Sequence, residues 1–243
     1  MAPTRWWQVK VGPAMRRERD LRLYTGMFAP EPWAVDGPLR AWSRQILPEP
    51  VRLGHEPRVL KKDELIVFRG LADYFDRLAP HRALIAERLA LVSRLSVSPE
   101  VFPVAAHVRR GDFSLASRTG DEWFLGVARS LRALGYTELI PLFSDGTIEE
   151  LAPLLDEGFV RQQGGSALED LWALANSRIL LASGASTFSS WGAFLGSALT
   201  VGPADHDITG LDRWFSGRVQ RVECVGPDLS KRMEDALSGV LWE

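Results

Sequence analysis

The residues best suited to chemistry form one short run near the middle of the chain, His107-Val108-Arg109-Arg110-Gly111-Asp112. The apolar residues before it, 103–106, indicate a buried strand that ends at Gly111. A guanidinium is permanently charged and offers a rigid fork of N–H donors that matches phosphate oxygens. In open α/β sheets, ligands bind at the carboxyl ends of the strands. The run therefore predicts a ligand that carries phosphate, such as a nucleotide.

Alternation along a strand predicts different tasks for the two arginines. Strand side chains point alternately to opposite faces, so His107 and Arg109 share one face and Arg110 takes the other. One guanidinium can then reach a ligand, while the other pairs with Asp112 or a neighbouring loop. The alternative is that both form ion pairs that only brace the turn. An adhesion role for Arg110-Gly111-Asp112 is disfavoured, because the chain has one cysteine and no recognisable export signal.

Polar residues also follow or precede other predicted elements. Phe143-Ser144-Asp145 closes a strand and Asp170 lies in the first turn of a helix, but an ordinary Asp-Gly turn and the helix dipole explain these acids without a ligand. The segment 183–192 is a stronger signal, since a small-residue turn precedes a helix with four hydroxyls between Ser186 and Ser190. N–H groups at a helix start bind anions, and capping alone needs only one hydroxyl.

An alternation of strands and helices must bring these residues together. From residue 101 onward, short apolar runs alternate with amphipathic segments, one of which opens at 166 with a capping box. Short connections between them imply an α/β fold with a mostly parallel sheet. Strands are predicted at 101–108, 139–143, 159–162, 178–182, 198–201 and 219–225, and helices at 121–134, 148–155, 166–176, 187–195 and 229–241.

The first hundred residues differ from the rest of the chain. Residues 1–62 are rich in proline and tryptophan and predict no long element, whereas helices are predicted at 63–78 and 81–95. We therefore expect two regions, a partly irregular one over 1–100 and a strand-helix domain over 101–243.

The composition narrows the class of protein. A chain of 243 residues with 46% hydrophobic and 25% charged residues is typical of a soluble globular protein. The net charge of −2 disfavours nucleic acid as the main partner. The single cysteine, Cys224, cannot form an internal disulfide, and no signal peptide or membrane span is recognisable. We expect a cytoplasmic protein, with peripheral association with a membrane left open.

Three motifs together resemble the GDP-fucose-dependent fucosyltransferase superfamily, most closely its α-1,2-fucosyltransferases. The resemblance covers residues 63–200 and implies a GT-B-like architecture, with 101–243 as the Rossmann-like donor-nucleotide domain and 1–100 as a partial acceptor-side region. It implies inverting, metal-independent transfer of fucose from GDP-fucose to a glycan hydroxyl, with no further cofactor. The motifs are His107-x-Arg109-Arg110-x-Asp112, Phe143-Ser144-Asp145, and Asp170-Leu171 with Ser186-Thr187-Phe188-Ser189-Ser190-Trp191-Gly192-Ala193.

The resemblance also implies a role for each candidate residue. Arg109 is the catalytic residue, since its charge offsets the negative charge that builds on the departing GDP. The remaining residues bind the donor: His107 and Asp170 contact guanine, Thr187, Ser189 and Ser190 hold phosphate with the helix start, and Arg110, Asp112 and Asp145 organise the pocket.

Two features depart from this pattern. No part of 1–62 matches the glycine-rich turn that opens the family's first half, so we expect the first βα unit to be absent. Asp205-His206-Asp207 formally matches a metal-binding Asp-x-Asp signature, but we interpret it as a solvated loop, with a metal site as the alternative. Two other functions stay open: a GDP-sugar-binding module without turnover, and a scaffold in which the arginines only brace the fold.

Overall fold

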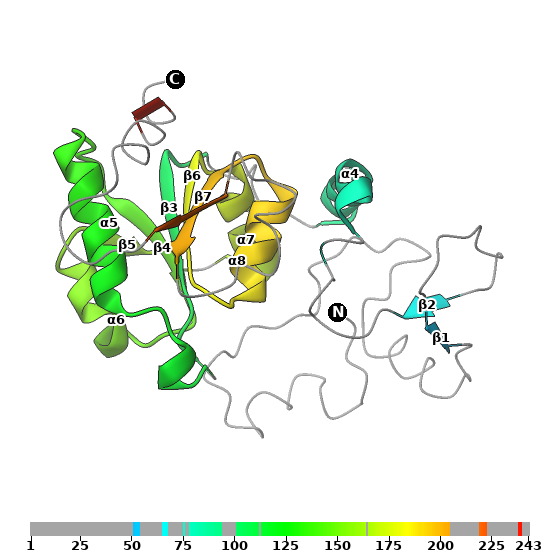
Figure 1. Cartoon of the computed structure of the whole chain (residues 1–243), viewed down its shortest axis with the longest axis horizontal. Helices are drawn as coiled ribbons and strands as arrows, with labels where there is room; N and C mark the ends of the chain where they lie inside the picture. The colour runs from blue at the N-terminus through cyan, green and yellow to red at the C-terminus, as the bar shows by residue number, and fades with distance from the viewer. Residues whose placement is uncertain are drawn as a thin grey trace.

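A parallel sheet forms the centre of the computed structural model, which describes residues 51–53, 65–67, 75, 78–93, 101–111, 113–163, 165–204, 219–222 and 238–239. Among these residues, six strands form one sheet in the order β5-β4-β3-β6-β7-β8, with every neighbouring pair parallel (Figure 1). The strands are β3 (Val104–Val108), β4 (Ile140–Ser144), β5 (Phe159–Arg161), β6 (Ile179–Ala182), β7 (Leu199–Pro203) and β8 (Val219–Val222).

The strand order identifies the fold as Rossmann-like. Numbered from β3, the strands follow the order 3-2-1-4-5-6 of nucleotide-binding α/β sheets. The chain first adds β4 and β5 on one side of β3, then returns to place β6 on its other side. The predicted α/β class and parallel sheet are therefore confirmed, and the order reverses between β3 and β6.

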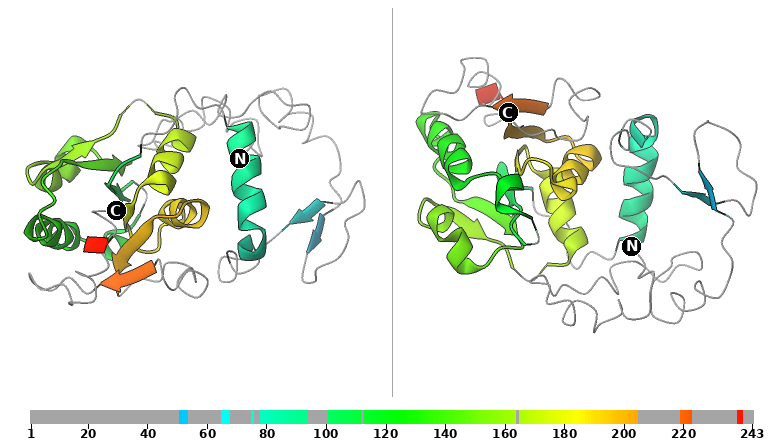
Figure 2. Two further views of the ribbon diagram at one scale, coloured as in Figure 1. Left: turned by 90° about the horizontal axis from the view of Figure 1, so that it is seen from above. Right: turned by 60° about the horizontal axis from the view of Figure 1, so that its bottom comes forward.

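Helices cover both faces of the sheet. The helices α5 (Asp121–Ala133) and α6 (Ile148–Leu155) lie on one face, and α7 (Ala167–Asn176) and α8 (Thr187–Leu195) lie on the other (Figures 1 and 2). Alternation along β3 supplies both cores: Val104, Ala106 and Val108 belong to the α5–α6 core, whereas Ala105 belongs to the α7–α8 core. A short 3-10 turn, η3 (Leu115–Ser117), lies between β3 and α5.

Local sequence signals fix the start of two of these helices. The Thr147 hydroxyl accepts from the Glu150 N–H at 3.2 Å, and the Glu150 carboxylate accepts from the Thr147 N–H at 3.0 Å. Ser166 and Glu169 form the same reciprocal pair at 3.2 and 2.6 Å, which confirms the predicted capping box. Each pair satisfies two N–H groups that a helix start leaves without partners.

A further helix, α4 (Arg82–Val92), packs on the outer side of α7 and α8 and follows the 3-10 turn η2 (Ala79–His81) (Figure 2). Its Ile85 and Leu89 lie against the α7–α8 core, to which Phe75 also belongs. Arg82 donates through Nε to the Phe194 carbonyl at 2.5 Å and through Nη2 to the carbonyls of the next two residues. A cation at this position satisfies the last carbonyls of α8 and complements its dipole.

Most predicted elements from 81 to 204 are present, whereas the helix predicted at 63–78 is wrong at its start. Residues Leu65–Val67 form the strand β2, which pairs in parallel with β1 (Val51–Leu53) in a separate two-stranded sheet. A tripeptide with two β-branched residues favours a strand once a partner strand is available.

Some predictions fall on residues that the structure does not describe. These are the helix at 229–241, of which only the helical pair 238–239 is described, the environment of Cys224 and the loop 205–207. Among the helices described, none has the length and apolar character that crossing a membrane requires.

Candidate functional site

The carboxyl ends of β3, β4 and β6 meet at the point where the strand order reverses. Arg109 and Arg110 follow β3, Asp145 follows β4, and Ser183 follows β6. Because β3 lies between β4 and β6 and all three run in parallel, these residues share one edge of the sheet. Such a reversal opens a crevice in which α/β proteins bind ligands. We call this edge, with the start of α8, the switch-point site.

Asp145 holds the residues that follow β3. Its Oδ2 forms an ion pair with Nη1 of Arg109 at 2.5 Å, and its Oδ1 accepts from the Arg110 N–H at 2.7 Å. The carboxylate side chain is only 6% exposed, whereas the Arg109 side chain is 28% exposed, with its guanidinium 5.5 Å from the ring centre of Phe113. The Arg109 side chain is thus the part of this cluster that solvent reaches.

A glycine makes room for this carboxylate. Gly111 has a φ of +20°, and a Cβ built on it would lie 2.2 Å from Oδ2 of Asp145. A side chain at position 111 would therefore displace the carboxylate or the turn. The glycine of the motif is required for the contact between the β3 and β4 ends.

Arg110 braces the loop that leads into α5. This residue is 4% exposed, and its Nη1 donates to the carbonyls of Arg109 at 3.2 Å and Thr119 at 3.0 Å, while Nη2 pairs with Asp121. The hydroxyl of Thr119 in turn accepts from the Gly184 N–H at 2.9 Å. The two guanidinium groups therefore have different partners, as alternation along the strand predicts, and Arg110 organises the edge from within the protein.

His107 and two serines of α8 bond to one another or to backbone inside the protein. Nδ1 of His107 lies 2.7 Å from the Ser189 hydroxyl, and its ring lies 5.0 Å from that of Phe188. The Ser190 hydroxyl donates to the Ser186 carbonyl at 3.0 Å, and both Ser189 and Ser190 are fully buried. Both hydroxyls are thus bonded within the protein in this structure, and the phosphate contacts expected of them stay a prediction.

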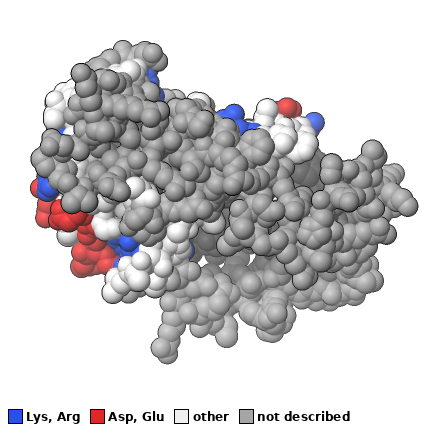
Figure 3. Space-filling view, in the orientation of Figure 1, with Lys and Arg blue, Asp and Glu red and all other residues white. Residues whose placement is uncertain are grey.

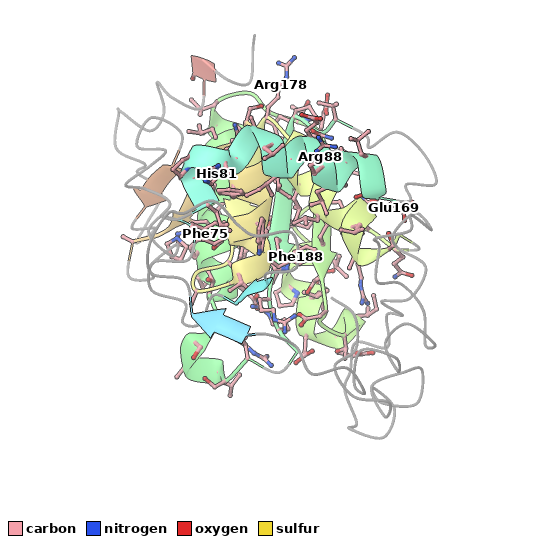
Figure 4. The ribbon with its side chains drawn as sticks, turned by 90° about the vertical axis from the view of Figure 1, so that its right-hand side faces the viewer. Phe75, His81, Arg88, Glu169, Arg178 and Phe188 are labelled. Atoms are coloured by element: carbon pink, nitrogen blue, oxygen red, sulfur yellow. The ribbon has the colours of Figure 1, made fainter. Side chains whose placement is uncertain are left out.

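The donors that α8 can still offer to an anion are its first N–H groups and an exposed hydroxyl. Thr187 is exposed, and Ser186 at the N-cap makes no side-chain capping bond. Ala185, just before it, adopts a φ of 55°, a conformation that L-residues seldom take and that strained functional turns often contain. In Figure 4, Phe188 lies below Arg178, since Arg178 precedes β6 and Phe188 lies in the first turn of α8, which follows β6.

The charge at the four helix starts of this edge is uneven. Acidic side chains occupy the first turns of three helices, and Figure 3 shows acidic atoms where α6 lies in Figure 1. The first turn of α8 has no acid, so its dipole is not offset by a neighbouring carboxylate there. Among these four described helices, α8 is the one suited to an anionic ligand. The acids are Asp121 and Glu122 of α5, Glu149 and Glu150 of α6, and Glu169 and Asp170 of α7.

Asp170 lies at the same edge and on the same face of the sheet as His107. It is 8% exposed in the first turn of α7, and a Cβ at Gly165 would lie 2.9 Å from its Oδ1. A guanine contact by Asp170 stays a prediction.

Asp112, the last residue of the arginine motif, lies outside the described residues. Among the residues described, no group of three or more His, Cys, Asp or Glu side chains could hold a metal ion.

Ser183 is the residue of this edge that sequence reasoning did not single out. It is 1% exposed, and its hydroxyl joins the backbone of His107 to that of Arg109. The available signal was its position, a hydroxyl directly after a buried strand next to the switch point.

In comparisons with known proteins, no family model and no curated sequence matches this chain.

Proposed function

We propose that the chain is a glycosyltransferase that binds GDP-fucose at the switch-point site and transfers fucose to a glycan hydroxyl. One observation carries the proposal: the His-x-Arg-Arg motif ends β3 at the reversal of a 3-2-1-4-5-6 sheet, where such folds bind nucleotides. The three motifs that resemble the fucosyltransferase superfamily also begin or end elements at this one edge. The proposal includes a GT-B-like pairing with an acceptor-side region.

Arg109 is the proposed catalytic residue. An acceptor hydroxyl attacks the anomeric carbon of fucose while the bond from that carbon to the β-phosphate oxygen breaks. The bonding electrons leave with GDP, and the proton of the hydroxyl passes to solvent water. Negative charge grows on the leaving phosphate, where a guanidinium stabilises it. A guanidinium has five N–H donors, so the contact of Nη1 with Asp145 is compatible with a phosphate at another edge of the same group.

The remaining contacts to the donor substrate come from α7 and α8, on the other side of Arg109 from Asp145. The start of α8, with its backbone N–H groups and the Thr187 hydroxyl, is the proposed phosphate cradle. His107 and Asp170 are the proposed guanine contacts, Asp170 as acceptor for the ring N1–H and amino group. Diphosphate and base would then lie along the α7–α8 side of the sheet, with the sugar towards Arg109.

Nucleotide selectivity is the first test. The full chain is titrated with GDP, UDP and ADP while its melting temperature is followed, and GDP is expected to raise it most. GDP release from GDP-fucose is then measured with a panel of glycan acceptors. A stabilising effect of GDP without any turnover would identify a binding module, and no effect of any nucleotide would contradict the proposal.

The second test compares two arginines. Arg109→Ala is expected to lower the transfer rate by about 100-fold or more, since removing one positioned charge donor typically has that effect. The matched control is Arg129→Ala on α5, whose side chain is 57% exposed and 4.0 Å from Glu122. Arg129→Ala should keep the melting temperature of the original chain, whereas Arg109→Ala should lower it by a few degrees at most, because its ion pair with Asp145 contributes about 0.5–1 kcal/mol. If the Arg109 variant retains activity within about tenfold, the catalytic assignment is wrong.

A further inference from the structure

Ser183 makes the last connection between β3 and β6. Backbone pairing between these strands ends at His107 and Ala182, and the Ser183 N–H then donates to the His107 carbonyl at 3.2 Å. The Ser183 hydroxyl donates to that same carbonyl at 2.9 Å and accepts from the Arg109 N–H at 2.9 Å. One side chain thus joins two backbone groups on either side of Val108.

The hydrogen bond from the Arg109 N–H to the Ser183 hydroxyl restrains the backbone of the residue that carries the proposed catalytic guanidinium. At Arg109 no residue of β6 remains in register to accept its N–H, so the hydroxyl takes the place of a strand carbonyl. The backbone N–H and the guanidinium belong to the same residue, and Asp145 fixes the latter from the β4 side. Arg109 is therefore held at its backbone by Ser183, which follows β6, and at its side chain by Asp145, which follows β4.

We propose that Ser183 is a positioning residue that sets the direction of Arg109 towards the ligand, an inference that rests on the proposed function. Loss of the hydroxyl removes this partner from the partly buried Arg109 N–H and allows the backbone after β3 to move. A displacement of about 1 Å in a catalytic group can lower a rate by about 100-fold. Ser183 itself touches neither substrate nor reacting atoms, so its effect passes through Arg109.

The test compares two buried serines that each donate to a backbone carbonyl. Ser183→Ala is measured against Ser177→Ala, because Ser177 is 2% exposed and donates to the Leu174 carbonyl at 2.8 Å, at the opposite end of α7 from the site. Both are expected to lower the melting temperature by similar amounts. Only Ser183→Ala is expected to lower kcat, by about 10- to 100-fold, with a smaller change in KM for GDP-fucose.

A near-isosteric variant and a ligand-free measurement complete the test. Ser183→Cys keeps the shape and a weak S–H donor, so its kcat should lie between those of the original chain and Ser183→Ala. Amide hydrogen exchange at Arg109, measured without ligand, should be at least tenfold faster in Ser183→Ala and unchanged in Ser177→Ala. Equal kcat values for the two alanine variants, or an unchanged Arg109 exchange rate, would overturn the inference.

The proposed function and this inference can fail separately. If the original chain neither binds GDP nor releases it from GDP-fucose, the proposed function fails, and with it the catalytic purpose of the positioning. If GDP binding and turnover are present but the Ser183 variants follow the Ser177 control, only the positioning role fails.

Discussion

Replacement of Gly111 by alanine should disconnect the ends of β3 and β4. The Cβ would lie 2.2 Å from Oδ2 and 2.9 Å from Cγ of Asp145, and the backbone φ of +20° is unfavourable for any L-residue. The carboxylate must then move, which breaks its bond to the Arg110 N–H and its ion pair with Arg109.

The size of the effect follows from these contacts. Backbone strain at position 111 contributes about 1 kcal/mol, and loss of a hydrogen bond to a buried carboxylate contributes about 1.5–3 kcal/mol. The ion pair adds about 0.5–1 kcal/mol, because the Arg109 side chain is partly exposed. Gly111→Ala should therefore lower the free energy of unfolding by about 3–5 kcal/mol.

Urea denaturation of four proteins tests this reasoning: the original chain, Gly111→Ala, Asp145→Ala and the double variant. With the carboxylate already removed, Gly111→Ala should cost about 1 kcal/mol, so the two substitutions should be coupled by about 2 kcal/mol or more. Gly120→Ala is the control, since a Cβ there meets no atom of the described part of the chain within 4 Å. A coupling below about 0.5 kcal/mol, or equal losses for the variants at 111 and 120, would refute the steric argument.

Three further substitutions test the frame around the site. Arg82→Ala should lower the free energy of unfolding by about 2–3 kcal/mol in urea denaturation, because it removes the partner of the last α8 carbonyls, whereas Arg88→Ala on the exposed side of α4 should have little effect (Figure 4). Burial, reinforced by Glu138, raises the pKa of Tyr136 from 10.0 to about 12, so stability should be full below pH 10 and decline between pH 10 and 12. Tyr136→Phe should abolish that decline without loss at pH 7, because the hydroxyl has no hydrogen-bond partner among the residues that the structure describes; a variant as alkali-sensitive as the original chain would contradict this. Thr147→Ala should cost about 1 kcal/mol by the same measurement through loss of the α6 cap, and no loss would contradict the capping role.

Local patterns predicted the elements of the sheet well, because each signal lies within a few residues. The helices at 148–155 and 187–195 have the predicted bounds, and the capping box at Ser166 is present. The strand order could not be predicted in the same way. It depends on which strand each crossover helix returns to, and that is decided by packing between distant segments.

In the candidate site, too, features within one strand could be predicted from the sequence, whereas contacts between strands could not. Alternation along β3 was sufficient to separate the partners of Arg109 from those of Arg110. The pairing of Arg109 with Asp145 needed the knowledge that β4 lies beside β3. The burial of Ser189 and Ser190 was missed because hydroxyls were counted along the segment, whereas helix phase decides which of them face the sheet.

The bond between Arg82 and the end of α8 limits how the chain can be shortened for biophysical work. A fragment that starts at residue 101 would return the terminal carbonyls of α8 to water and uncover the aromatic surface on which Phe75 packs, 5.3 Å from Trp191 and 5.2 Å from Phe194 between ring centres. Such an exposed aromatic surface promotes aggregation. An isotope-labelled or crystallised piece intended to retain the switch-point site should therefore begin before Phe75, even though that residue precedes the first strand of the sheet.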